Sequence, residues 1–289
     1  MNQGSFAFKA LAFYGTHMHH RGQWRVHAKL RSLFDANLDC EMEVERAGLR
    51  WVLNPSDYVQ RNLFWLGEHD RWDTYHIKRL LPADAVVCDV GANFGYYSLT
   101  LASFLKQNGR LFAFEPHPAT RASLERNIAL NQLGDVITVI PKALSDTPGT
   151  VRMAKREDNT GASYICPDGE TEVEVTTLDC VYAQHGLSRL DFVKIDVEGF
   201  EAHVLRGAHH CLRTLHPMLL VELMPRQLER TGSTAAEVAA LLRDHGYALY
   251  VSERTRLLPL TTLPTGSQLI NVFCLRANLA NDASTNKGA

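Results

Sequence analysis

The stretch VVCDVGANFGYYS, residues 86–98, decides the fold that we expect for this chain. An apolar run ends at Asp89 and Val90, and the turn that follows contains Gly91 and Gly95. Glycine adopts positive φ without a steric penalty, so this spacing suits a sharp turn that leads from a buried strand into a helix. The pattern predicts a strand over 85–90 and a helix over 96–107.

The same strand–helix rhythm continues along the chain. Predicted strands and helices alternate at 85–90, 96–107, 110–116, 118–133, 136–144, 190–199, 200–215, 217–223 and 234–246. Alternation at this period is typical of a doubly wound, mostly parallel α/β sheet with right-handed crossovers. Residues 247–253 and 267–277 are expected to close the sheet as a hairpin.

Three segments fall outside this rhythm. Residues 1–67 are expected to form an extension, with a helix over 1–35 and a hairpin over 40–60 that turns near Gly48. Residues 145–177 are polar and glycine-containing and predict a β-rich insertion beside the ligand site. The predicted domains are therefore the extension 1–67, the main domain 68–277 and a disordered tail 278–289.

Composition narrows the function class. The chain has 289 residues, 45% of them hydrophobic, and a net charge of −2, so no overall field attracts nucleic acid. The six scattered cysteines form no C-x-x-C pair, which favours thiols in a reducing, cytoplasmic setting. No apolar run is long enough for a membrane span, and residues 1–15 lack the basic start of a secretory leader. The basic stretch 17–31 suggests either a solvated helix face or a peripheral contact with anionic lipid.

The glycine turn also predicts a ligand. A dinucleotide fingerprint has the spacing G-x-G-x-x-G, whereas this turn has G-x-x-x-G with Asp89 in front of it. A carboxylate there would repel pyrophosphate but suit a cationic group. Glu115 ends the next strand, where an acid binds ribose hydroxyls. A nucleoside with a cationic amino-acid arm satisfies both features, and S-adenosylmethionine fits that description.

Four blocks of the sequence resemble the FkbM-type methyltransferases. They are VVCDVGANFGYYSLTLA, FAFEPHPATRASLERNIALN, VIPKALSD and LDFVKIDVEGFEAHVLRGA, which lie within residues 68–225. The resemblance implies a seven-stranded Rossmann-like fold, S-adenosylmethionine as cofactor, and O-methylation of a sugar in a glycan, glycolipid or secondary metabolite. The residues expected to contact the cofactor are Asp89, Gly91, Ala92, Asn93, Gly95, Tyr96, Ser98, Glu115, Pro116, Ala143 and Asp196. His117 either lines the adenine pocket or belongs to a loop.

The end of the strand at 190–199 carries the residues expected to do the chemistry. Asp196 and Glu198 are candidates for a general base, and His203 follows them within the next helix. A second alternative is that Asp196, Glu198 and Glu222 hold Mg²⁺ through oxygen ligands. In a third alternative, Lys194 or a nearby arginine neutralises these carboxylates and no ion is needed. Lys194 itself either contacts the substrate or is the buried partner of a carboxylate such as Asp89 or Glu222.

The acceptor is expected to contact Asn159, Thr160 and Ser163 of the insertion, together with Lys194 and Glu222. Other function classes fit less well. A transferase that methylates nitrogen or carbon of a small molecule predicts a motif such as N-P-P-Y where D-V-E-G stands, and a non-catalytic S-adenosylmethionine-binding module has no need for Asp196 and Glu198. A nicotinamide dehydrogenase would need the third glycine.

Overall fold

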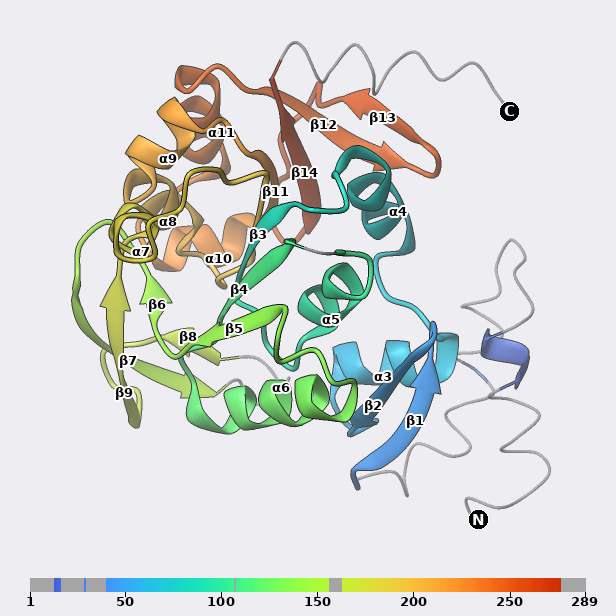
Figure 1. The fold of residues 1–289 in the computed structure, drawn as a ribbon. Helices are drawn as coiled ribbons and strands as arrows, with labels where there is room; N and C mark the ends of the chain where they lie inside the picture. The colour runs from blue at the N-terminus through green and yellow to red at the C-terminus, as the bar shows by residue number, and fades with distance from the viewer. Residues whose placement is uncertain (1–12, 17–28, 30–39, 107, 156–162, 277–289) are drawn as a thin grey trace.

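A mixed sheet of eight strands, in the order β13-β12-β14-β11-β10-β3-β4-β5, forms the centre of the computed structural model (Figure 1). The structure describes residues 13–16, 29, 40–106, 108–155 and 163–276. The strands of this sheet are β3 (Val86–Val90), β4 (Arg110–Phe114), β5 (Ile137–Ile140), β10 (Phe192–Ile195), β11 (Met218–Leu223), β12 (Ala248–Glu253), β13 (Arg256–Pro259) and β14 (Ile270–Leu275). Parallel pairing joins β11, β10, β3, β4 and β5, which confirms the predicted doubly wound α/β fold of the class I methyltransferases.

The sheet has eight strands and not the expected seven, because β13 forms a tight hairpin with β12 before the chain reaches β14. Only Arg254 and Thr255 connect β12 and β13, and Arg254 has φ +53°. Such two-residue turns usually contain Asn or Gly. Since this turn has neither, the sequence gives no signal for the extra strand.

Helices cover both faces of the sheet (Figure 1). They are α3 (Tyr58–Leu66), α4 (Arg71–Leu80), α5 (Tyr96–Ala102), α6 (Pro118–Leu130), α7 (Leu178–Gln184), α8 (Glu201–Arg206), α9 (His209–Thr214), α10 (Pro225–Arg230) and α11 (Ala235–Asp244). The helix predicted over 200–215 is interrupted at Gly207 and Ala208, where the backbone of Gly207 packs closely against the backbone oxygen of Ser145. The short helices α3, α7 and α10 were not predicted.

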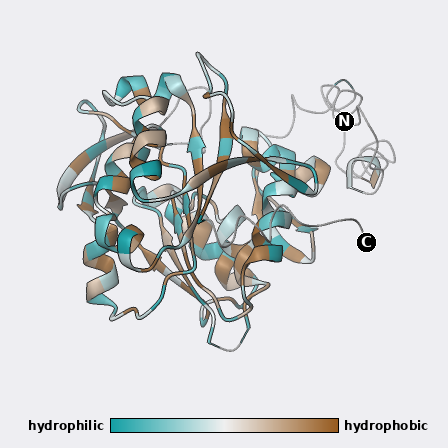
Figure 2. Cartoon of the chain, turned by 90° about the horizontal axis from the view of Figure 1, so that it is seen from above, coloured by the Kyte–Doolittle hydropathy of each residue, from teal (hydrophilic) through white to brown (hydrophobic). Residues whose placement is uncertain are grey.

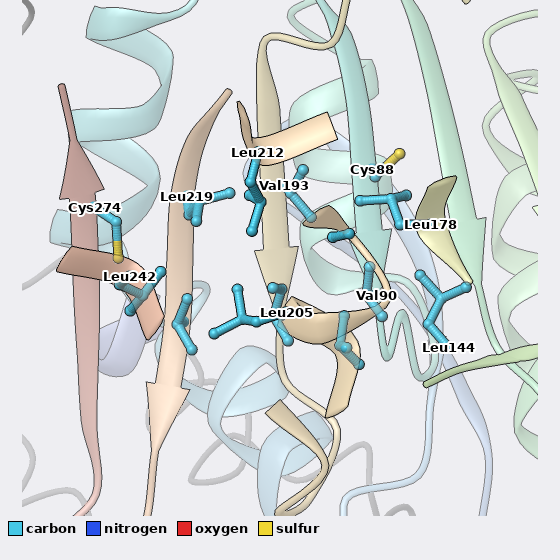
Figure 3. Close-up of a cluster of buried hydrophobic side chains, with 14 of the residues drawn as sticks. Cys88, Val90, Leu144, Leu178, Val193, Leu205, Leu212, Leu219, Leu242 and Cys274 are labelled. Atoms are coloured by element: carbon cyan, nitrogen blue, oxygen red, sulfur yellow. The ribbon is translucent and has the colours of Figure 1, made fainter. Parts of the chain in front are cut away.

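Alternate residues of the strands enter two separate cores. Val87 belongs to the cluster under α3–α6, whereas its neighbour Cys88 belongs to the cluster under α7–α9 and α11. Figure 3 shows the second cluster, in which Cys88, Val193 and Leu219 meet leucines of α8, α9 and α11. Hydrophobic residues concentrate on the central strands in Figure 2. Burial of both sheet faces explains the continuous apolar runs in the sequence.

The predicted β-rich insertion is a separate four-stranded sheet. Its order is β6-β9-β7-β8, formed by β6 (Ala143–Leu144), β7 (Gly149–Lys155), β8 (Ser163–Ile165) and β9 (Thr171–Thr176). Its small core contains Met153, Val173 and Val175. Because β6 directly follows β5, this sheet stands at the edge of the main one, next to the carboxyl ends of its strands.

The predicted hairpin is present as β1 (Met42–Arg46) and β2 (Leu49–Leu53). Its turn contains Gly48, with φ +76°. The backbone N–H of Val52 donates to Asn127 Oδ1 of α6 at 2.8 Å, which ties the hairpin to the main sheet. No helix within the described parts of the chain is long and apolar enough to cross a membrane. The domain boundaries and the cytoplasmic location stay predictions, and most of the basic stretch 17–31 lies outside the described residues.

Candidate active site

A cavity of about 580 Å³ opens at the carboxyl ends of the parallel strands. Residues after β3, β4, β10 and β11 line it, and the strand order reverses between β3 and β10. Ligands of doubly wound sheets bind at this switch point. The cavity lies where the glycine turn predicted a ligand.

The glycine turn joins two neighbouring strands. A side chain at Gly91 would lie 1.8 Å from the backbone oxygen of Asp196, and Gly91 has φ +82°. Gly95 is close-packed as well, because a side chain there would lie 2.6 Å from Leu99 Cδ1. Both glycines were expected to admit a ligand, but their missing side chains make room for protein atoms. Gly91 therefore lets the turns after β3 and β10 approach each other.

Glu115 is the best-positioned acid of the cavity. Its side chain is buried, and its two oxygens accept from the backbone N–H groups of Asn93 (3.0 Å) and His117 (2.9 Å). Burial raises the pKa of Glu115 to about 7, although both N–H donors act to lower it. A carboxylate oxygen that accepts one such bond still has a lone pair for a ligand hydroxyl. Glu115 can thus receive two hydroxyl groups in a fixed geometry, which is the arrangement that a ribose requires.

Most other residues expected at the cofactor also line the cavity. They are Gly91, Ala92, Asn93, Tyr96, Pro116, Ala143 and Asp196. Gly95 is absent from the lining, and His117 is buried away from it. The sequence did not suggest Thr120, Lys142 or Leu144, which lie on the same side.

Asp89 and Ser98 lie beneath the cavity and not on its lining. The Ser98 hydroxyl donates to Asp89 Oδ2 at 2.6 Å, and Lys194 Nζ lies 4.0 Å from Asp89 Oδ1. The reason is the strand period of two: Val90 and Cys88 face α7–α9, so Asp89 faces α5, where Ser98 meets it. The expected contact of Asp89 with a cationic ligand is replaced by contact with a lysine of the protein.

Lys194 connects Asp89 to the cavity. Its ammonium group lies 2.8 Å from Asp196 Oδ2 and 4.7 Å from the centre of the Tyr97 ring. Burial lowers the pKa of Lys194, but the charges of Asp196 and Asp89 outweigh burial and raise it above the usual value. Lys194 is therefore a permanent cation at the bottom of the cavity.

The three carboxylates expected at the reaction centre all line the cavity. Asp196 pairs with Lys194, and Glu198 accepts a hydrogen bond from the amide of Gln227. Burial raises the pKa of Glu222 well above its ordinary value, and the charge of Asp196 adds to the effect. No group of three or more metal-ligating side chains occurs within the described residues. Neutralisation by Lys194 is thus visible in the structure, and the predicted Mg²⁺ site finds no support.

Glu198 holds an uncommon backbone conformation. Its φ is +55°, which costs energy for a residue with a side chain. Glu201, which the sequence analysis did not single out, supports this turn: its Oε1 accepts from the N–H groups of Val197 (3.2 Å) and Gly199 (3.1 Å). The sequence signal that could have indicated Glu201 is the spacing of the three acids in D-V-E-G-F-E, residues 196–201.

His203 does not reach the cavity. Its Nδ1 lies 3.2 Å from Asp146 Oδ2, in the turn after β6, and its ring packs against Phe200. Helix α8 presents this histidine to the edge sheet, since Gly207 one turn later rests on Ser145. The contacts of His203 thus give no support to the prediction that it acts as a base.

The edge sheet contributes one wall of the cavity. Met153, Ser163, Tyr164 and Ile165 line it. Ser163 was expected there, and its hydroxyl finds no hydrogen-bond partner among the residues that the structure describes. The expected Asn159 and Thr160 lie outside the described residues.

Known proteins with similar sequences agree on one family. The family model of the methyltransferase FkbM domain matches residues 89–249. The antimetabolite synthetase AmbE of Pseudomonas aeruginosa is 27% identical in an alignment of 274 positions, which covers 81% of this chain but only 12% of that protein's length. The 31-O-demethyl-FK506 methyltransferase FkbM of Streptomyces tacrolimicus is 27% identical, over 68% of this chain and 84% of its own. The hexuronic acid methyltransferase AglP of Haloferax volcanii is 25% identical, over 72% and 86%.

Proposed function

Since the chain belongs to the FkbM methyltransferase family and is an S-adenosylmethionine-dependent methyltransferase, we propose that it methylates a hydroxyl group of a sugar-containing acceptor. The observation that carries this proposal is the distribution of acids around the cavity. Glu115 lies on the β4 side of β3, whereas Asp196, Glu198 and Glu222 lie on the β10–β11 side. One side suits a ribose, and the other suits the hydroxyls of an acceptor.

The cofactor side fits S-adenosylmethionine. When bound, this cofactor supplies a methyl group on a positively charged sulfur. Glu115 would accept the two ribose hydroxyls, and the backbone at Ala92 and Asn93 would lie against the nucleoside. Pro116 and Ala143 would pack on the adenine.

Asp196 is the proposed general base. During transfer, the acceptor oxygen forms a bond to the methyl carbon, the carbon–sulfur bond breaks with its electrons on sulfur, and the hydroxyl proton passes to a carboxylate. Lys194 fixes one oxygen of Asp196 at 2.8 Å, and the other oxygen is available to the acceptor. Glu198 is held by Gln227 and would position the acceptor. Glu222, with its raised pKa, would donate a hydrogen bond as a neutral acid.

The relatives support oxygen as the accepting atom. One is named for 31-O-demethyl-FK506, which gives oxygen as the atom, and another is named for hexuronic acid, a sugar derivative. A hydroxyl of a sugar or secondary metabolite is therefore the acceptor that we propose. A small-molecule, glycan or glycolipid acceptor fits a cavity of about 580 Å³. Nothing in the acid-rich lining favours a nucleic acid.

The test is transfer of an isotope-labelled methyl group to a panel of methyl glycosides. The panel contains neutral, amino-bearing and uronic-acid pyranosides, and nuclear magnetic resonance identifies the methylated atom. We expect a new methyl ether on at least one glycoside. Binding of S-adenosylmethionine without labelling of any glycoside, or a label on nitrogen or carbon only, would overturn the sugar O-methyltransferase proposal.

A further inference from the structure

Part of the cavity wall comes from residues outside the region that the family model matches. Residues 89–249 are matched, yet Tyr58, Val59, His69 and Asp70 line the cavity from before it, and Leu269 and Asn271 from after it. The glycine turn, Glu115 and Asp196 all lie inside the matched region. The matched region thus contains the cofactor side, and residues before and after it complete the cavity wall.

Tyr58 is a partly exposed aromatic residue of the cavity wall, and the guanidinium carbon of Arg61 lies 5.5 Å from the centre of its ring, so one face of the ring is left for a ligand. Tyr58 is 55% exposed, although it lines the cavity and begins α3. The helix start is fixed, because Asp57 Oδ1 accepts from the N–H of Gln60 at 2.9 Å and Gln60 Oε1 accepts from the N–H of Asn54 at 2.8 Å. An exposed aromatic ring on a fixed support offers a flat apolar surface to a ligand.

Asp70 lies at the same cavity in a strained conformation. Its φ is +45°, which non-glycine residues adopt at a cost. Two neighbours hold its side chain: the Tyr97 hydroxyl donates to Oδ2 at 3.0 Å, and His69 Nε2 lies 3.3 Å from the same oxygen. Both contacts use Oδ2, so Oδ1 is left for a ligand. Backbone strain that surrounding contacts maintain at a cavity points to a ligand-binding role.

The charges near this wall are mainly negative. The carboxylates of Asp70, Asp196 and Glu198 line the cavity, and the buried cation Lys194 already pairs with Asp196. An anionic acceptor would meet these carboxylates at close range in a partly buried space. An uncharged or amino-bearing acceptor would not be repelled.

We propose that Tyr58 and Asp70 form the acceptor subsite, in which a neutral or amino-bearing pyranose ring lies with its C–H face on the Tyr58 ring and donates a hydroxyl hydrogen bond to Asp70 Oδ1. This inference rests on the proposed function. It assigns residues before the matched region to acceptor recognition, beside the carboxylates inside it.

The experiment uses the full chain and whichever glycoside of the panel is methylated most efficiently. Tyr58→Ala, Tyr58→Phe and Asp70→Asn are compared with wild type for acceptor KM, kcat and S-adenosylmethionine affinity. Tyr75→Ala is the matched control, since Tyr75 is an aromatic residue with 39% exposure that does not line the cavity. Thermal unfolding checks that each variant is folded.

We expect Tyr58→Ala to raise the acceptor KM roughly five- to ten-fold, which corresponds to the loss of one aromatic contact. Tyr58→Phe should keep the wild-type KM. Asp70→Asn should raise KM roughly ten-fold. Cofactor affinity should stay unchanged in all variants. Folded Tyr58→Ala and Asp70→Asn proteins with wild-type KM would overturn the subsite, even with the methyltransferase activity intact. A uronate methylated more efficiently than its neutral counterpart would overturn the charge preference, and absence of any glycoside product would instead overturn the proposed function.

Discussion

Replacement of Glu115 by glutamine tests the cofactor side most directly. In the wild type, both carboxylate oxygens are fixed by backbone N–H groups at 3.0 and 2.9 Å. Glutamine keeps one acceptor oxygen, but its NH₂ group would face the second N–H and could not accept a ribose hydroxyl. A hydrogen bond to a charged group contributes about 1.5–3 kcal/mol, so we expect S-adenosylmethionine and S-adenosylhomocysteine to bind about 10- to 100-fold more weakly.

The pH dependence of binding gives a second measure of the same group. Because the pKa of Glu115 is about 7 before ligand binds, a proton competes with the ribose hydroxyls below that pH. Wild-type affinity should therefore rise as pH increases towards 7 and level off above it. About one-tenth of the groups are ionised at pH 6, which predicts roughly ten-fold weaker binding at pH 6 than at pH 8. Glutamine does not titrate, so Glu115→Gln should lose this rise.

Calorimetric titration with S-adenosylhomocysteine at pH 6, 7 and 8 measures both effects. Glu172→Gln is the matched control, because Glu172 is an exposed acid on β9, outside the cavity. Its affinities should equal those of the wild type at each pH. Glu115→Gln protein that is folded and binds as tightly as wild type, or wild-type affinity that does not change between pH 6 and 8, would refute the assignment of Glu115 to the ribose.

Three further predictions concern the turn and the reaction centre. Gly91→Ala should abolish cofactor binding and lower the free energy of unfolding by several kcal/mol, measured by chemical unfolding, because the new Cβ would lie 1.8 Å from the backbone oxygen of Asp196. Gly134→Ala is the control, since a Cβ at Gly134 meets nothing within 4 Å, and it should change neither cofactor binding nor stability. Asp196→Asn should lower kcat roughly 100-fold with cofactor affinity retained, whereas the control His203→Ala should keep the wild-type kcat. Equal turnover by Asp196→Asn and wild type would exclude Asp196 as the base. Exhaustive chelation should leave activity in place, because Lys194 already neutralises Asp196; recovery only after Mg²⁺ is added would show a metal requirement.

The sequence predicts the parts of this molecule that depend on local pattern. The buried strands, the turn at Gly91 and the acid Glu115 all follow from hydrophobic runs and spacing within single segments. The proposed acceptor subsite does not, because Tyr58 and Asp70 precede the main sheet in the sequence whereas Asn271 lies on its last strand, β14, and they meet only in the folded chain. Their sequence context is ordinary, and the strained backbone that distinguishes Asp70 is not visible in its residue type.

Asp89 shows why even a correct motif can mislead about chemistry. An acid at the end of the first strand was expected to face a cationic ligand, since burying an unpaired carboxylate is costly. In the structure a residue of the protein, and not a ligand, supplies the cation that offsets this cost. It is Lys194, which lies on the adjacent parallel strand, directly opposite Asp89 in register. Lys194 also pairs with Asp196 at 2.8 Å. One buried charge therefore orients Asp196, the proposed base, and neutralises Asp89. An amino acid at position 194 that could not carry a charge would leave two carboxylates unpaired, one of them fully buried. Lys194 is thus required both for the stability of the fold and for the orientation of the proposed base. Both requirements follow from the register of the strands, which the sequence alone does not specify.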